Sequence, residues 1–196
     1  MVRVHPQVGV NVQLGIALGH GLRSAFWSFF IALAVIWPFS YTGPSYKTSL
    51  RAARSGPWYM WFAGPMGAFY VASSILLTPA MGVSLYFIFV VLGSLAASIV
   101  IDHTGLLGFP VRQTSLLRAS GVALVLAGSV LAQDFSGTKG SEAGLVSLYS
   151  FIAFVAGALL PLQAALNGMR TRQMGSTLKS AVVSFTTGAI ALAIAA

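Results

Sequence analysis

Long stretches without any charged side chain are the feature that most constrains the fold of this chain. Asp, Glu, Lys and Arg are absent from residues 24–46, 55–101, 119–133, 143–169 and 180–196. A helix needs about 20 apolar residues to cross the hydrocarbon core of a bilayer. Four of the five windows hold at least one such helix, and the shortest reaches a marginal length if its helix begins at Ser115. The pattern therefore predicts helices that cross a membrane.

Six membrane spans are predicted from these windows. The longest window holds two of them, with its break at Thr78-Pro79, because the residue before a proline leaves the helical region. Only 7% of the residues are charged, whereas soluble domains carry about 25%. The expected fold class is all-α, a polytopic transmembrane helical bundle in contact with the lipid bilayer. The predicted spans are Leu22–Phe39, Trp58–Leu77, Met81–Ile101, Ser115–Gln133, Leu145–Leu166 and Leu178–Ala196.

Basic residues in the connectors and at the span ends indicate the orientation. Eight fall on one side of the membrane and two on the other, and the side rich in Lys and Arg usually faces the cytoplasm. Connectors 40–57, 102–114 and 167–177 are therefore expected to be cytoplasmic. The eight are Lys47, Arg51, Arg54, Arg112, Arg118, Arg170, Arg172 and Lys179, and the two are Arg23 and Lys139.

Several classes of function are disfavoured by composition. The net charge is +8, but the basic residues are scattered without interleaved aromatic residues, so a nucleic-acid partner is not expected. The chain has no cysteine, which excludes disulfides, thiolate metal sites and cysteine nucleophiles. His5, His20 and His103 have no metal-ligand spacing, and no carboxylate pair is placed for hydrolysis. Neither an enzyme nor a metal or cofactor is expected.

An internal repeat appears when the sequence is compared with itself at an offset of 156 residues. Eight identities fall within the 23 positions from Gln7 to Phe29, without a gap. Polar Asn, Gln and Ser in one register are harder to obtain by chance than apolar matches, so we expect a true duplication. The matched pairs are Gln7 and Gln163, Asn11 and Asn167, Gly19 and Gly175, Leu22 and Leu178, Ser24 and Ser180, Ala25 and Ala181, Ser28 and Ser184, and Phe29 and Phe185.

The two copies differ in charge where an inverted orientation would require it. Leu14 and Ile16 of the first copy correspond to Arg170 and Arg172 of the second. The copies therefore lie on opposite sides of the membrane, and one repeat holds an odd number of helices, five by this count. Inverted repeats are typical of secondary transporters, whose substrate path lies at the repeat interface.

We expect residues 1–142 to form a first unit whose N-terminal helix is truncated. Residues 143–196 are expected to form the beginning of a second, inverted unit, which stops after two helices of an expected five. Either both ends are truncated, or the protein is a remnant that needs partners.

A known family matches these motifs in their order along the chain. The stretch Leu159-Leu160-Pro161-Leu162-Gln163-Ala164-Ala165-Leu166-Asn167, with Met174-Gly175-Ser176 and Val183-Ser184-Phe185-Thr186-Thr187-Gly188, resembles the bacterial YdcZ-like family of the drug/metabolite transporter (DMT) superfamily. Further matches are Pro57-Trp58, Gly64, Gly67-Ala68-Phe69, Pro79-Ala80-Met81-Gly82, Ile101-Asp102-His103-Thr104-Gly105 and Phe109-Pro110-Val111-Arg112 with Arg118 and Gly121.

This resemblance implies a multispanning protein of the bacterial inner membrane, built from five-helix units within one chain or from separate chains. It implies a secondary carrier that exports or exchanges small metabolites or drugs, but no particular substrate carries over. A member with two units would have about ten helices, whereas this chain offers six spans and a short N-terminal stub. The alternative is a non-transporting subunit or remnant that only assembles with or modulates another chain. A homodimer or heterodimer with a complementary unit is left open.

The best candidates for a substrate path are Gln7, Asn11, Gln163 and Asn167. Gln and Asn four residues apart lie on one face of a helix, and polar groups of a membrane helix face the bundle or a cavity. The competing interpretation is adhesion between helices, where such bonds contribute about 0.6–2 kcal/mol each. Both interpretations remain open from the sequence.

Asp102 is the only acidic residue outside the connector that holds Asp134 and Glu142. It follows the span Met81–Ile101 and precedes His103. Ionisable groups near membrane paths often relay protons or cations, so Asp102 is a candidate ion relay. The alternative, which we favour from sequence, is an interfacial residue that caps a turn or pairs with Arg112.

Overall fold

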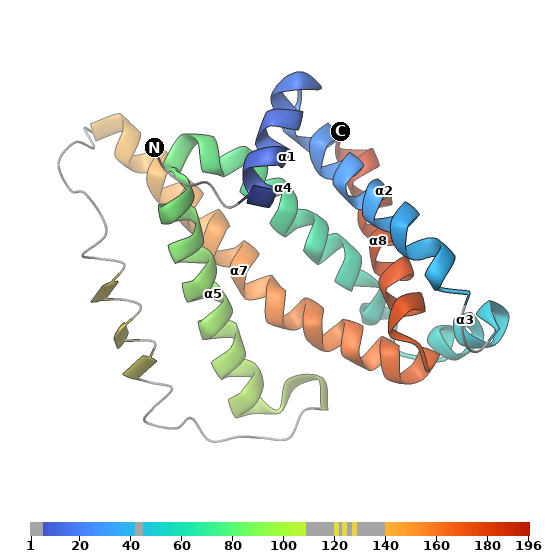
Figure 1. Cartoon of the computed structure of the whole chain (residues 1–196). Helices are drawn as coiled ribbons and strands as arrows, with labels where there is room; N and C mark the ends of the chain where they lie inside the picture. Colours follow the sequence, from blue (N-terminus) through green and yellow to red (C-terminus); the bar gives the residue numbers. More distant parts are fainter. Residues whose placement is uncertain (1–5, 42–44, 109–119, 122, 125–126, 129–139) are drawn as a thin grey trace.

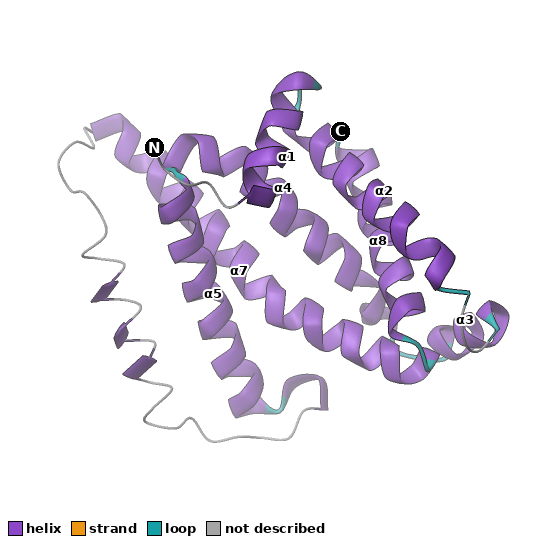
Figure 2. Cartoon of the chain, in the orientation of Figure 1, coloured by secondary structure: helices purple, strands orange, loops and turns teal. Residues whose placement is uncertain are grey.

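The computed structural model describes residues 6–41, 45–108, 120–121, 123–124, 127–128 and 140–196. These residues form helices joined by short connections, with no strand among them (Figure 2). The predicted all-α fold is confirmed. The helices are α1 (Pro6–Ala17), α2 (Gly21–Phe39), α3 (Tyr46–Arg54), the 3-10 turn η1 (Trp58–Phe62), α4 (Ala63–Met81), α5 (Val83–Thr104), the 3-10 turn η2 (Leu106–Gly108), α7 (Gly140–Met174) and α8 (Thr177–Ala195).

Five of the helical stretches in the described part are long and apolar enough to cross a membrane. The predicted span Ser115–Gln133 lies largely outside the described residues. Helix α1 has 12 residues, which is shorter than the roughly 20 that a crossing requires. The five long apolar stretches confirm the predicted polytopic bundle. The five stretches are Gly21–Phe39, Trp58–Met81, Val83–Thr104, Ser147–Met174 and Thr177–Ala195.

Helix α4 lies at the centre of the bundle and is the most buried of the five. On one side it packs with α2 and α8 around Ala25, Phe29, Ala72 and Leu192. On its other side, Leu77 belongs to a second apolar cluster that α4 forms with α5 and α7. Helices α5 and α7 lie side by side, as do α2 and α8 (Figure 1).

Glycines allow two pairs of helices to approach closely. A Cβ on Gly157 of α7 would lie 2.7 Å from the Cα of Val90 on α5, and one on Gly93 of α5 would lie 2.8 Å from the carbonyl carbon of Phe154. A Cβ on Gly188 of α8 would lie 2.9 Å from the carbonyl oxygen of Gly64 on α4. Close backbone approach of this kind is how membrane helices gain packing energy without a hydrophobic driving force.

Two predicted helix boundaries are wrong. The expected break at Thr78-Pro79 does not occur, because α4 continues through Pro79 to Met81 and ends at Gly82, whose φ is 84°. A proline costs a helix one hydrogen bond and bends it, but neighbouring helices in a membrane make this tolerable.

The second wrong boundary is the predicted end of a span at Leu166, which placed residues 167–177 in a connector. Residues 167–174 continue α7 as far as Met174, and Gly175 with φ of 63° then ends the helix. The left-handed conformation of Gly175 is one that only glycine adopts easily. Within the predicted connector 40–57, residues 46–54 form helix α3.

Candidate functional site

Helices α1 and α2 form a hairpin held by two hydrogen bonds to Asn11. Ser24 Oγ of α2 donates to the carbonyl oxygen of Asn11 at 2.5 Å. One turn further along α2, Ser28 Oγ donates to Asn11 Oδ1 at 2.8 Å. The Asn11 side chain is buried, so its amide is used to join the two helices.

The end of α7 and the helix α8 form a second hairpin with the same two bonds. Ser180 Oγ donates to the carbonyl oxygen of Asn167 at 3.3 Å. Ser184 Oγ donates to Asn167 Oδ1 at 2.6 Å. Each atom in this second hairpin belongs to the residue that stands 156 positions after its counterpart in the first.

The turns of the two hairpins also have the same backbone conformation. Gly19 and Gly175 both have a positive φ, of 73° and 63°. The residues that follow them, His20 and Ser176, are extended N-caps with φ of −158° and −156°. Each cap accepts a hydrogen bond from a backbone N–H in the first turn of the next helix. Capping of this kind satisfies a donor that a helix start leaves unpaired.

Equivalent residues of the two hairpins contact each other across the bundle. The rings of Phe29 on α2 and Phe185 on α8 lie 5.4 Å apart between centroids, with an angle of 69° between their planes. An edge-to-face arrangement at this distance is favourable for aromatic pairs. Helices α2 and α8 therefore meet at matching positions of the two hairpins.

Arg170 is the largest fully buried side chain among the described residues, with an exposed fraction of 0%. Its Nε donates to Ser180 Oγ at 3.1 Å and its Nη1 to the carbonyl oxygen of Met60 in η1 at 3.2 Å. Its Nη2 donates to Asn167 Oδ1 at 2.5 Å, to the Ser180 carbonyl oxygen at 3.0 Å and to Ser184 Oγ. The guanidinium thus ties both helices of the second hairpin to η1.

Sequence reasoning missed this role of Arg170. It placed the residue in a cytoplasmic connector and used it only to assign orientation. The first hairpin has Leu14 at the equivalent position and joins its helices without a buried cation. A signal was present in the spacing, because Asn167 lies one helical turn before Arg170 and is therefore on the same face.

The other predicted path residues are only partly brought together. Gln163 lies one turn before Asn167 on α7, and its amide lies against α4 so closely that a Cβ on Gly67 would overlap it. Asn11 belongs to the other hairpin. Gln7 lies on α1, and its side chain is outside the described part of the structure.

Asp102 lines a cavity of about 370 Å³ between the cytoplasmic ends predicted for α5 and α7. Arg172 lines the same cavity, and the remaining wall is made mostly of small residues such as Ser98 and Gly168. Arg112, the partner considered for Asp102, lies outside the described residues. Within the described part of the chain, no three His, Asp or Glu side chains group closely enough to hold a metal ion.

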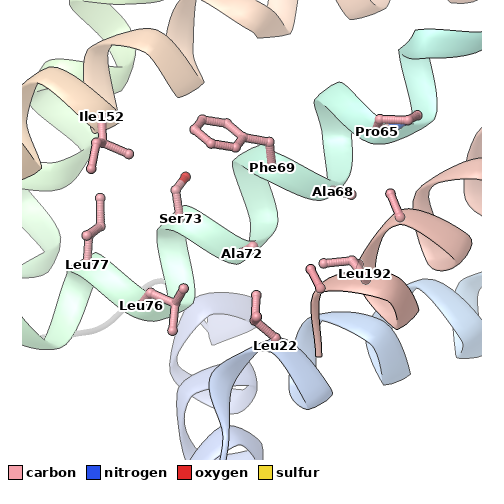
Figure 3. Close-up of a pocket in the computed structure, with 12 residues that line it drawn as sticks. Leu22, Pro65, Ala68, Phe69, Ala72, Ser73, Leu76, Leu77, Ile152 and Leu192 are labelled. Atoms are coloured by element: carbon pink, nitrogen blue, oxygen red, sulfur yellow. The ribbon is translucent and has the colours of Figure 1, made fainter.

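A larger cavity of about 400 Å³ lies on the face of α4 that carries Ala68, Ala72 and Leu76 (Figure 3). Leu22 of α2 and Leu192 of α8 face it from the two hairpins.

The lining of this α4 cavity is apolar apart from Ser73, whose Oγ hydrogen bonds with the Tyr86 hydroxyl at 2.8 Å and donates to the Tyr70 carbonyl oxygen at 2.9 Å. Ile152 of α7 completes the wall beside Leu77. Sequence reasoning did not identify this cavity, because its walls carry the same residue types as any buried helix face.

Comparison with known families gives one match. The model of a family described as "Putative inner membrane exporter, YdcZ" matches residues 4–131 and 148–196, which is most of the chain. No curated protein and no solved structure matches the chain. The two matched segments include both hairpins and the cavity on α4.

Proposed function

Because the chain belongs to the YdcZ family of inner membrane exporters, we propose that it is a secondary exporter of small solutes with a largely apolar body. Family membership confirms the resemblance drawn from the sequence motifs and the multi-pass location in the inner membrane. The family is described as one of exporters, which supports the expectation that the chain is not an enzyme. The substrate class is the part that this proposal adds.

The observation that carries the proposal is the apolar cavity on α4. Sites for small molecules are commonly clefts of about 300–1,000 Å³ with apolar walls and a few polar groups, and this cavity measures about 400 Å³. The hydroxyl of Ser73, its one polar side chain, is already engaged with Tyr86. The walls therefore suit a solute that makes mainly van der Waals contacts.

The two hairpins support a second part of the proposal, which is an inverted repeat with units at residues 1–142 and 143–196. The matching hydrogen bonds at Asn11 and Asn167, the matching turns and the contact between Phe29 and Phe185 are what a duplicated hairpin would produce. Carriers with inverted repeats bind substrate between the repeats. The cavity is lined by α2 and α8, the equivalent helices of the two hairpins.

Among the predicted path residues, we assign adhesion to Asn11 and Asn167. We keep Gln163, which is not among the residues that line the α4 cavity, as a candidate substrate contact elsewhere along the path. The amide oxygens of both asparagines accept bonds from the neighbouring helix. The Gln163 amide lies between α7 and α4. Gln7, its counterpart at the 156-residue offset, is proposed for the same role in the first unit. We further propose that segments 40–57, 102–114 and 167–177 lie on the cytoplasmic side, the last of them as the end of α7 and its turn to α8.

Blocking the cavity tests the proposed function. Ala191 of α8 lines the cavity, whereas Ala193 on the same helix is exposed and does not. A phenyl ring at position 191 would occupy part of the cavity and compete with a solute for the same volume, and a loss of about 1.4 kcal/mol of solute binding corresponds to a factor of about ten. We expect Ala191→Phe to reduce efflux by this factor and Ala193→Phe to leave it unchanged.

The measurement is efflux of the neutral aromatic dye N-phenyl-1-naphthylamine from vesicles that contain the purified chain. Equal efflux by the two variants would show that the cavity is not on the path. A correctly folded parent protein that moves neither this dye nor a panel of radiolabelled apolar metabolites would instead favour a non-transporting membrane subunit.

Asp102→Asn tests the candidate ion relay. Asp102 lies within the last turns of α5 beside an exposed His103. A carboxylate at this interface does not have to carry an ion through the bilayer. We therefore expect the variant to keep the efflux rate of the parent across the pH range that the protein tolerates. Loss of efflux at every pH, with normal expression and thermal stability, would assign Asp102 to ion coupling.

A further inference from the structure

We propose that helix α3 is a binding site for the phosphate headgroups of anionic lipids, formed by Lys47, Arg51 and Arg54. These residues are spaced four and three apart and therefore lie on one face of the helix. All three side chains are exposed. Among the described residues no carboxylate forms an ion pair with them, so the face presents three positive charges to whatever lies beside it.

The opposite face of α3 fixes the helix to the bundle. Ser49 Oγ donates to the carbonyl oxygen of Met174 at 3.1 Å, at the end of α7. Ala53 is buried in an apolar cluster with Met174 and Val183. Figure 1 shows α3 at the end of the bundle, beside the turn between α7 and α8. The basic face is therefore held outward by contacts on the other side of the same helix.

A buried lysine adds a further link between α3 and the bundle. Lys179 of α8 has an exposed fraction of 0%, and its Nζ lies 5.5 Å from the centroid of the Tyr46 ring, at the first residue of α3. Cation–π contacts of this kind are stronger when the cation is removed from water. Both ends of α3 are thus anchored, through Tyr46 and Ala53.

Aromatic residues place α3 at the level of the lipid headgroups. The rings of Trp37, Tyr41 and Tyr46 lie within 6.1 Å of one another between centroids, and Trp58, just after α3, has an exposed fraction of 73%. Trp and Tyr concentrate at the membrane–water interface. Only residues 40–45 and 55–57 separate α3 from α2 and η1, so the helix cannot move far from that interface.

This position favours lipid over a soluble anionic partner. The phosphates of a bilayer surround the end of the bundle at all times, whereas an acidic protein or an RNA would have to displace them. The guanidinium of arginine binds phosphate through two parallel N–H bonds, and Arg51 and Arg54 stand on adjacent turns. Basic residues beside a membrane are attracted to its anionic lipids.

The test compares two double variants that lose the same charge. Arg51→Gln/Arg54→Gln removes two charges from α3, and Arg23→Gln/Arg172→Gln removes two exposed charges elsewhere. The purified full chain in detergent is mixed with equal amounts of phosphatidylglycerol and phosphatidylcholine, and the bound lipids are counted by native mass spectrometry. We expect the parent to prefer phosphatidylglycerol, and the α3 variant to lose this preference by a factor on the order of tenfold.

The control variant and Arg51→Lys/Arg54→Lys should both keep the preference, because each retains the charge of α3. Circular dichroism and thermal melting check that all variants are folded. Equal losses in the α3 and control variants would overturn the proposal, since net charge alone would then explain binding. Displacement of the lipid by millimolar inorganic phosphate would overturn it too, because the site would then be one for a free anion.

Discussion

Asn167→Ala is expected to destabilise the protein several times more than Asn11→Ala, although the two residues are equivalent. Asn11 loses one bond from the neutral Ser28 hydroxyl, and such bonds in membrane proteins average about 0.6 kcal/mol. Asn167 also accepts from the buried Arg170 at 2.5 Å, and hydrogen bonds to charged groups contribute about 1.5–3 kcal/mol. Unfolding in mixed detergent micelles measures both losses.

A double-mutant cycle isolates the contribution of the charge. In the Arg170→Leu background the site resembles the first hairpin, which has Leu14 at this position. We expect Asn167→Ala to become as mild there as Asn11→Ala is in the parent, which corresponds to a coupling free energy of about 1–3 kcal/mol. Equal effects of Asn167→Ala and Asn11→Ala in the parent would mean that the hydrogen bond from Arg170 to Asn167 adds nothing to the free energy of unfolding.

Gly157→Ala is the second substitution with a large expected effect. The new Cβ would lie 2.6 Å from the carbonyl carbon of Val90 and 2.7 Å from its Cα. Because these are backbone atoms, α5 and α7 would have to separate, and forced packing of this kind costs about 1–3 kcal/mol or more. We expect a clear loss of thermal stability in detergent.

Gly168→Ala provides the matched control on the same helix. A Cβ at Gly168 would meet nothing within 4 Å, and alanine is favoured over glycine in a helix by about 0.8–1.0 kcal/mol. This variant should therefore be as stable as the parent or slightly more stable. If Gly157→Ala were equally harmless, the close crossing of α5 and α7 would be wrong.

Charge placement alone predicts most of the fold, because a charged residue inside a span is expensive and the spans are therefore marked by its absence. Helix ends were harder to predict. Pro79 has a strong local preference that the packing of α4 overrides, and Gly82 ends the helix instead. The continuation of α7 past Leu166 was hidden because basic residues indicated a connector, whereas Arg170 is buried within the helix.

The candidate site was predictable where polar residues recur in register. Asn11 and Asn167 were identified from spacing, together with the two interpretations of their role. Their serine partners were in the same match, but a sequence does not show which atoms bond. The cavity on α4 could not be predicted, because an empty volume depends on how far helices stand apart and not on the residue types that face it.

The glycine crossings have a mechanical consequence for any transport cycle. At Gly93 and Gly157, α5 and α7 meet through backbone atoms that have no rotamer to change, and at Gly64 and Gly188 the backbones of α4 and α8 meet beside Thr187 and Phe29. We therefore expect α5 with α7 and α4 with α8 to move as stiff units. We then expect relative motion at the seam where α4 meets α7, because there the Gln163 side chain, and not backbone, lies against Gly67. Ser73 and Ile152 stand on either side of that seam and line the same cavity, so sliding along it would change the volume available to a solute.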